Sequence, residues 1–213
     1  MRFYLETERL ILRNLTPEDD QAAFLWCGDP EVAEYMVYPV YTRAEDVRTW
    51  LESLDPDDPD EYEAGIVLKE TGELIGSGGL YYDRETDLWK IGYNLRKDQW
   101  GNGYAVEMIR GLLEYVRCRR DVRGLLGNFA AENHRSRRVM EKLGMTFAED
   151  VTLSKMDGSA SYPGKRYRRL FDEDAEKRRR KENETGVYHW QRRCRQNDCR
   201  TGTDETDRAE TVP

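Results

Sequence analysis

The stretch Ile91–Glu107, with the sequence I-G-Y-N-L-R-K-D-Q-W-G-N-G-Y-A-V-E, decides how the chain folds. Its apolar start predicts a strand, and apolar side chains recur at helical spacing from Ala105 to Cys118. A strand therefore runs through a glycine-rich turn directly into a helix. Backbone N–H groups in such a turn, with the positive end of the helix dipole, form a socket for a phosphate or pyrophosphate. Gly101 and Gly103 let the backbone approach such a ligand without interference from a Cβ atom.

Other phosphate-binding motifs do not fit this turn. The dinucleotide pattern G-x-G-x-x-G fails because Val106 stands at the place of the third glycine. The nucleotide P-loop fails because no G-K-S/T follows the glycines. The turn also follows a predicted meander of strands instead of opening a βαβ unit. A glycine turn with a purely structural role remains the alternative interpretation.

Strands and helices alternate on both sides of the turn. We expect helices at 16–28, 42–54, 105–118 and 134–143, where apolar residues recur at helical spacing. We expect strands at 5–13, 63–69, 73–82, 88–95, 122–129, 146–153 and 166–170. These elements together form one domain, residues 1–171, which is long enough to bury a core.

The composition changes after Phe171. Residues 172–213 contain ten Lys and Arg and eleven Asp and Glu, with almost no aliphatic side chains. Such a segment cannot bury enough apolar surface to offset the entropy of ordering it. We therefore expect 172–213 to be a charged C-terminal tail, partly helical or disordered.

Charge and hydropathy argue against several classes of partner. A formal net charge of −8 gives no overall attraction to nucleic acid or to an anionic membrane, so we expect neither as a partner. No apolar run approaches the roughly 20 residues of a membrane helix, and Met1–Leu12 lacks the apolar core of a signal peptide. Scattered cysteines fit reduced thiols in a cytoplasmic protein: Cys27, Cys118, Cys194 and Cys199. His189 and the last two cysteines make a poor zinc site, so we expect no metal. A monomer and a homodimer both stay open.

The motif W-G-N-G-Y-A-V-E, preceded by I-G-Y-N-L, resembles the acyl-CoA loop of the GCN5-related N-acetyltransferase (GNAT) superfamily. Gly103 and Ala105 match the small positions of the pattern Q/R-x-x-G-x-G/A, and Trp100 replaces its first residue, as in the RimJ/RimL-like branch. A second block, Glu132–Met145, reads E-N-H-R-S-R-R-V-M-E-K-L-G-M and is similar to that branch's N-x-x-S-x-x-V-x-E-K-L-G-F. The opening E-T-E-R-L-I-L-R-N-L matches its first strand, so the resemblance covers roughly residues 5–171.

The resemblance implies the GNAT fold, an α+β architecture. A mixed, mostly antiparallel central sheet of six to seven strands is flanked by about four helices in this fold. It also implies an acyltransferase that moves an acetyl group from acetyl-CoA to a primary amine by direct attack in a ternary complex. The amine acceptor is either a small molecule or a protein N-terminus, and Tyr35, Tyr38 and Tyr41 either line its pocket or belong to the core. The alternative is a non-catalytic domain that binds acyl-CoA as a sensor or assembly module.

The resemblance also assigns cofactor contacts. In this superfamily the strand before the loop splays from its neighbour, which places Asn94 and Leu95 beside the pantetheine arm. Backbone N–H groups of the loop bind the pyrophosphate, and here they belong to Gly101, Asn102, Gly103, Tyr104 and Ala105. Asn133 matches a position whose side chain bonds the pantetheine or the acyl region. A plain helix N-cap is the alternative interpretation of Asn133.

Two catalytic residues follow from the same resemblance. Many relatives protonate the leaving thiolate with a tyrosine, but the matching position here is Met140, so Ser136, where the branch has a serine, is the candidate acid. Glu149 matches the acid of the branch's G-F-x-x-E-G and is the candidate base. A routine helix residue and a solvent-facing charge are the alternative interpretations of Ser136 and Glu149. Lys90 departs from the branch, which usually has Glu before I-G-Y.

Overall fold

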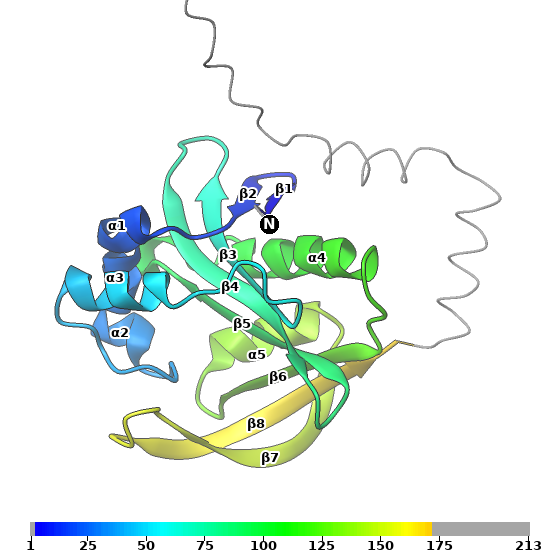
Figure 1. Ribbon diagram of the computed structural model, residues 1–213. Helices are drawn as coiled ribbons and strands as arrows, with labels where there is room; N and C mark the ends of the chain where they lie inside the picture. Colours follow the sequence, from blue (N-terminus) through cyan, green and yellow to red (C-terminus); the bar gives the residue numbers. More distant parts are fainter. Residues whose placement is uncertain (1–2, 172–213) are drawn as a thin grey trace, which may run out of the picture.

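The computed structural model of the chain describes residues 3–171 (Figure 1). The division into a domain at 1–171 and a tail at 172–213 stays a prediction, because the tail lies outside the described residues together with Cys194, Cys199 and His189. Across residues 3–171, no helix is both long enough and apolar enough to cross a membrane.

Strands and helices are layered around one sheet. The strands are β1 (Tyr4–Glu6), β2 (Leu10–Arg13), β3 (Glu61–Leu68), β4 (Leu74–Asp83), β5 (Leu88–Leu95), β6 (Gly124–Ala130), β7 (Thr146–Ser154) and β8 (Ser161–Leu170). The helices are α1 (Asp20–Cys27), α2 (Pro30–Ala33), α3 (Ala44–Glu52), α4 (Tyr104–Arg117) and α5 (His134–Lys142), with short 3-10 turns at Pro17–Asp19 and Lys97–Gln99. The strand order is β1-β2-β3-β4-β5-β6-β8-β7. Only β5 and β6 are parallel neighbours within the described sheet.

The predicted α+β fold with a mostly antiparallel sheet is confirmed, but the predicted counts of strands and helices are too low. The segment 5–13 is two strands because the chain reverses at Thr7. There the Thr7 N–H donates to the Leu10 carbonyl at 2.9 Å, and the Leu10 N–H donates to the Thr7 hydroxyl at 3.1 Å. The additional helix is α2, whose N-cap Asp29 accepts a hydrogen bond from the Glu31 N–H at 2.8 Å. Within residues 3–171 the sheet thus has eight strands and five α-helices around it.

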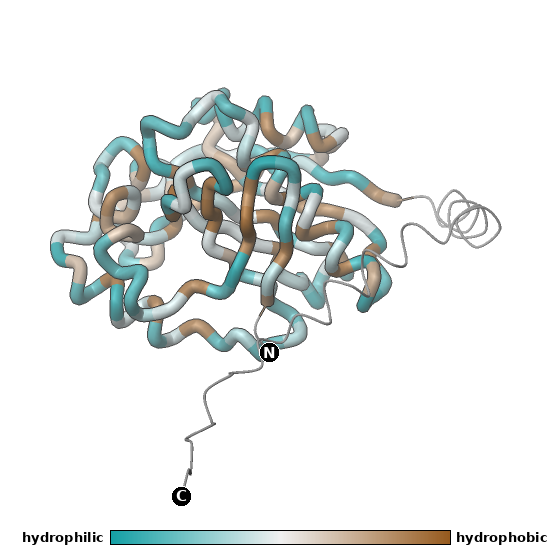
Figure 2. The backbone as a smooth tube through the Cα atoms, turned by 90° about the horizontal axis from the view of Figure 1, so that it is seen from above, coloured by the Kyte–Doolittle hydropathy of each residue, from teal (hydrophilic) through white to brown (hydrophobic). Residues whose placement is uncertain are grey.

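Each face of the sheet has its own apolar core. Helices α4 and α5 pack on one face, where the core includes Leu10, Ile66, Leu80, Trp89, Ile109, Leu112, Leu125 and Met140. Helices α1, α2 and α3 pack on the β2–β4 end of the other face, where the core includes Trp26, Val32, Val47, Leu51, Val67 and Leu74. Figure 2 shows apolar segments gathered in the interior and hydrophilic segments in the peripheral loops.

The sheet splits between β5 and β6. These two strands are paired only at Trp89 with Leu125 and at Lys90 with Leu126. From Ile91 onward, β5 pairs with β4 alone, while β6 pairs along its length with β8. The two strands therefore diverge toward their carboxyl ends, as the predicted splay requires, and the glycine loop follows directly from the open end of β5.

The β7–β8 hairpin reaches across to the segment after α2. The Lys155 ammonium donates to the carbonyl oxygens of Ala33 at 2.7 Å and Tyr38 at 3.1 Å. The Met156 N–H donates to the Val37 carbonyl at 2.7 Å. Figure 1 shows the hairpin tip beside the chain that leaves α2. This contact connects the β7–β8 end of the sheet to the helices that cover its β2–β4 end.

Candidate active site

The loop between β5 and α4 depends on two glycines. Gly101 has a φ of 86° and Gly103 a φ of 84°, in the left-handed region that residues with a Cβ rarely adopt. Gly103 is also the N-cap residue of α4. The backbone conformation therefore requires glycine at both positions, in addition to the close approach predicted from the sequence.

The same loop presents a run of unbonded backbone N–H groups. Among the described residues, none accepts a hydrogen bond from the N–H groups of Gly101, Asn102, Gly103, Tyr104, Ala105 and Val106. The next N–H group, that of Glu107, donates to the Gly103 carbonyl at 3.1 Å. Consecutive free donors at the positive end of a helix dipole form an anion site. The first five of them are the donors predicted to bind a pyrophosphate.

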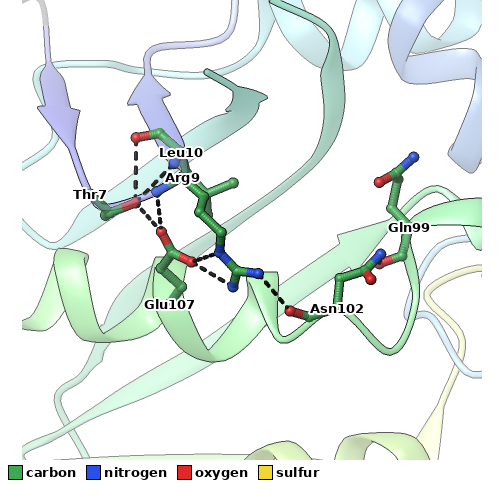
Figure 3. A network of polar contacts seen from close by, with 6 residues as sticks. All are labelled: Thr7, Arg9, Leu10, Gln99, Asn102 and Glu107. Atoms are coloured by element: carbon green, nitrogen blue, oxygen red, sulfur yellow. Dashed lines mark hydrogen bonds and ion pairs between the residues drawn. The ribbon is translucent and has the colours of Figure 1, made fainter. Parts of the chain in front are cut away.

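Arg9 holds this loop from the N-terminal hairpin (Figure 3). Its guanidinium donates to the Asn102 carbonyl at 3.1 Å and pairs with the Glu107 carboxylate at 2.7 Å. Glu107 also accepts hydrogen bonds from the Thr7 hydroxyl at 2.6 Å and the Arg9 backbone N–H at 2.7 Å. Burial alone would raise the pKa of Glu107, but these donors outweigh burial and the pKa is lowered. Glu107 is thus an ionised carboxylate that fastens α4 to the β1–β2 turn.

Trp100 connects the loop to β5 and α5. Its indole N–H donates to the carbonyl oxygen of Leu95, which is itself buried at the end of β5, at 2.9 Å. The Arg135 guanidinium, from the first turn of α5, lies over the Trp100 ring at 4.4 Å from its centroid. The loop is therefore held from β5 and α5 as well as from Arg9.

Three polar residues lie together on the face that carries α5. Asn133 and Ser136 were predicted as site residues, and Tyr93 is their neighbour. The Asn133 side chain accepts a hydrogen bond from the Ser136 N–H at 3.0 Å, which confirms that Asn133 is the N-cap of α5. The buried Tyr93 hydroxyl lies beside the half-buried Ser136. Burial raises the pKa of Tyr93 to about 12, against the opposing influence of Ser136. Met140 is buried in the core of this face.

The opposite face carries a second polar cluster beside the split. The Ser77 hydroxyl of β4 donates to the side-chain oxygen of Asn94 on β5 at 3.3 Å. On β3, the Glu63 carboxylate accepts a hydrogen bond from the Tyr81 hydroxyl. Burial raises the pKa of Glu63, and its contacts with Tyr81 and Ser77 offset only part of that rise. Asn94 thus lies on the splayed part of β5 with its side chain engaged by β4.

Glu149 lies on β7, at the other end of the sheet. Its carboxylate pairs with the Arg166 guanidinium at 2.7 Å. Both residues line a hollow of about 380 Å³ together with Arg123 and Arg168, where β5 and β6 are still paired. Within the described part of the chain, no hydrogen bond joins Glu149 to Ser136. The two predicted catalytic residues therefore belong to different faces and different surroundings.

The three tyrosines between α1 and α3 divide between two settings. Tyr38 and Tyr41 pack against the core under α1–α3, with ring centroids 5.7 Å apart. The Tyr35 ring instead packs edge-on against Tyr162 of β8, at 5.9 Å between centroids. Tyr35 thus adds to the contact between the β7–β8 hairpin and the segment after α2.

The sequence profile described as "Acetyltransferase (GNAT) domain" matches residues 9–146, which include the glycine loop, the split strands and α5. The chain belongs to the GNAT acetyltransferase family. This match spans well over half of the chain, and it confirms the GNAT fold predicted from the motifs.

Two relatives from Bacillus resemble this GNAT chain in sequence. The uncharacterized N-acetyltransferase p20 of Bacillus licheniformis is 36% identical over 115 residues, which are 52% of this chain and 64% of p20. The uncharacterized protein YkkB of Bacillus subtilis is 30% identical over 155 residues, 69% of this chain and 87% of YkkB. The similarity to p20 thus spans slightly less than two thirds of that relative.

Solved GNAT structures share the fold at low sequence identity. An acetyltransferase from Bacillus anthracis has a TM-score of 0.68 at 22% identity, covering 79% of this chain and 98% of its own. MccE, a microcin self immunity acetyltransferase in complex with acetyl-CoA and AMP, has a TM-score of 0.67 at 15% identity, covering 77% and 93%. RimL, an alpha-N-protein acetyltransferase in its apo form, has a TM-score of 0.67 at 16% identity, covering 80% and 96%. These likenesses concern the fold alone.

Three residues of this GNAT domain do not stand out in the sequence. Arg9 contacts Glu107 across 98 positions of the chain, a separation that local patterns do not bridge. Tyr93 belongs to the quoted strand motif, but only the pairing of β5 shows that it faces α5. For Glu63 the sequence contains only a weak sign: this acidic residue stands directly before the apolar run A-G-I-V-L.

Proposed function

We propose that the chain is an N-acetyltransferase of the RimJ/RimL-like branch that moves an acetyl group from acetyl-CoA to a primary amine. The observation that carries the proposal is the run of free N–H groups from Gly101 to Val106, placed at the open end of a split sheet. A pyrophosphate needs such donors, and a flexible thioester arm needs an unpaired strand edge beside them. MccE, which shares the fold, is in complex with acetyl-CoA.

The residues present fit acetyl-CoA as the donor substrate. The N–H groups of Gly101, Asn102, Gly103, Tyr104 and Ala105 would bind the pyrophosphate. Asn94 and Leu95 would lie along the pantetheine arm, where β5 has no pairing with β6. The side-chain oxygen of Asn133 caps α5, which leaves its amide N–H₂ group for the arm.

The two faces of the split suit the two halves of the reaction. The neutral amine nitrogen attacks the thioester carbonyl carbon and forms the N–C bond, the nitrogen gives up a proton to a base, the C–S bond breaks, and the thiolate sulfur takes a proton. On the α5 face, the Ser136 hydroxyl and the neighbouring Tyr93 hydroxyl would donate the proton to the thiolate sulfur. The amine would approach from the face of α1–α3. Glu149 lies on β7, the edge strand of the sheet. It is the base that the family resemblance implies.

The acceptor is a primary amine of a small molecule or of a protein N-terminus. RimL acts on an alpha-amino group of a protein by its name, whereas MccE is a self immunity enzyme bound to AMP. The same fold therefore serves different acceptors, because the segments that contact the acceptor vary on a constant scaffold.

Titration calorimetry with acetyl-CoA, CoA and NADP tests the donor site. We expect micromolar binding of acetyl-CoA and CoA and no binding of NADP. Failure of the folded protein to bind acetyl-CoA would leave the glycine loop with a structural role only.

Release of free CoA thiol, measured against a panel of amines and N-terminal peptides, tests the reaction. We expect turnover with at least one member, reduced in Glu149→Gln but not in the exposed control Asp150→Asn. Binding of acetyl-CoA without turnover of any amine would instead identify a sensor or assembly module.

A further inference from the structure

Glu63 is a carboxylate without a cationic partner. It lies on the α1–α3 face of β3, half-buried, and among the described residues no Lys, Arg or His forms an ion pair with it. The neighbouring cation on that face, Lys90 of β5, pairs with Asp83 at 3.3 Å. Removing a carboxylate from water without a compensating charge is costly. A cation supplied from outside the chain would remove that cost.

Two glycines lie between Glu63 and the split in the sheet. Glu63 is paired with Gly79 of β4, and Gly79 is paired with Gly92 of β5, two residues past the last contact between β5 and β6. The Tyr81 ring lies across both glycines: a Cβ at Gly79 would stand 2.9 Å from the Tyr81 hydroxyl, and one at Gly92 3.0 Å from its ring. Tyr81 thus extends from the edge of the split to the Glu63 carboxylate.

A second tyrosine, Tyr38, belongs to the helix layer on the same face of the sheet. The Tyr38 hydroxyl is buried and has no hydrogen-bond partner among the described residues. Burial raises the pKa of Tyr38, the neighbouring Cys27 and Tyr41 add to the rise, and Glu63 contributes less than either. Ionisable groups that face Glu63 are Glu61 on its own strand, Tyr81 on β4, Cys27 on α1 and Tyr38 after α2. None of them is a cation, whereas a carboxylate beside a tyrosine ring suits an ammonium group.

The distance to the split decides what that ammonium belongs to. Two strand spacings separate Glu63 from Gly92, about 10 Å between their backbones. The Glu63 side chain ends at the Tyr81 hydroxyl, which lies over Gly79. It therefore does not reach an amine that would attack a thioester held in the split, beyond Gly92. An ammonium bound at Glu63 would therefore be a second cationic group of the acceptor, separate from the reacting amine.

We propose that Glu63 and Tyr81 bind the distal ammonium of a diamine or polyamine, whose other amine reaches the split and is acetylated. This inference rests on the proposed acetyltransferase function and names its class of acceptor. It assigns Glu63 to acceptor binding, and it leaves proton removal from the reacting amine to another group.

Putrescine and butylamine test the proposal, because they share a four-carbon chain and differ in the second amine. In the wild-type enzyme we expect kcat/KM for putrescine to exceed that for butylamine by about 10- to 100-fold, the value of one charge-assisted contact. In Glu63→Gln the ratio falls to about one, chiefly through a higher KM for putrescine. Glu61→Gln, a matched change on the same strand and face, keeps the wild-type ratio. Tyr81→Phe lowers the ratio in part and replaces Glu63→Gln if that variant does not fold.

A wild-type ratio near one, or a ratio that survives Glu63→Gln, overturns the proposal, as does a preference for N-terminal peptides over every diamine. If no amine or N-terminal peptide of the panel is acetylated while acetyl-CoA still binds, the acetyltransferase proposal fails by itself, and infrared difference spectra then decide the question of Glu63. Putrescine is expected to shift a carboxylate band in the wild-type protein and in Glu61→Gln, but not in Glu63→Gln. Absence of that band shift contradicts the ammonium site independently of turnover.

Discussion

Arg9 in the β1–β2 turn and Glu107 in the first turn of α4 form a salt bridge with 2.7 Å between the guanidinium and carboxylate atoms. The same guanidinium donates to the Asn102 carbonyl, inside the glycine loop. A hydrogen bond to that carbonyl orients the peptide unit that also contains the Gly103 N–H. The N-terminal hairpin therefore sets the direction of one of the N–H groups that form the anion socket.

Arg9→Ala is expected to weaken acetyl-CoA binding about tenfold, because two charge-assisted contacts to the loop and to α4 are lost. Isothermal titration calorimetry gives the dissociation constant. Arg84→Ala removes an exposed arginine that pairs with Asp60 at 2.7 Å far from the loop, and it is expected to bind acetyl-CoA like the wild type. Equal affinities of Arg9→Ala and Arg84→Ala for acetyl-CoA would refute the role of Arg9 in orienting the loop.

Gly101→Ala and Gly72→Ala form a matched pair. Both glycines have positive φ, 86° and 74°, and an added Cβ would meet no atom within 4 Å at either site. Each variant should lose about 1 kcal/mol of unfolding free energy from backbone strain. Only Gly101→Ala should weaken acetyl-CoA binding, since only Gly101 shapes the socket. Urea unfolding and calorimetry measure the two effects, and weaker binding in Gly72→Ala would point to a general loss of stability.

Ser136→Ala and Tyr93→Phe should lower kcat without changing acetyl-CoA affinity, because in the proposed reaction these two hydroxyls donate the proton to the leaving sulfur. A loss of about 100-fold is typical of removing a general acid. The exposed Ser53, whose hydroxyl bonds the Trp50 carbonyl at 2.7 Å on α3, supplies the control Ser53→Ala. Steady-state kinetics with the best amine of the panel provides the measurement. A wild-type kcat in both single variants would remove the α5 face from the chemistry.

Glu63 and Asp19 should give stability profiles of opposite slope. Burial raises the folded-state pKa of Glu63, so its contribution is fully present below the unfolded pKa of about 4.3 and is lost as pH rises through the folded value. Glu63→Gln should therefore melt above the wild type at about pH 8 and lose this advantage near about pH 4. For Asp19, burial alone would raise the pKa, but hydrogen bonds from Arg13 and Thr16 outweigh it and the pKa is lowered.

Asp19→Asn should accordingly melt below the wild type at neutral pH, and the difference should vanish as pH falls through the lowered folded pKa. Melting temperatures of both variants, measured across the same buffers, test the two signs together. Parallel slopes would mean that one of the two assignments is wrong.

The part of the fold that depends on local chemistry could be predicted from the sequence. The glycine loop and α4 were accessible because positive φ demands glycine and because α4 buries one apolar face: Val106, Ile109, Leu113 and Val116 are among its buried residues. The N-cap role of Asn133 could be predicted for the same reason. One local feature was nevertheless missed, the turn at Thr7 between β1 and β2. A threonine hydroxyl closes this turn, without the glycine or proline that marks most turns.

The candidate site itself was only partly accessible. Residues of the socket follow one another in sequence, so their grouping is visible before the structure is known. Arg9, Tyr93 and Glu63 come from three different strands or turns, and their environment arises from pairing across the sheet. Ser136 and Glu149 were predicted together by resemblance, yet Glu149 pairs with Arg166 among the arginines of another hollow.

The socket of main-chain donors has a consequence for the history of the family. Substitutions can change almost every side chain around it, because the donor site requires only that the backbone keep the conformation of this turn. Lineages could then exchange one acceptor for another while the thioester substrate stayed the same. MccE and this chain share the fold at a TM-score of 0.67 although only 15% of their residues are identical, so the backbone shape tolerates wide change in sequence.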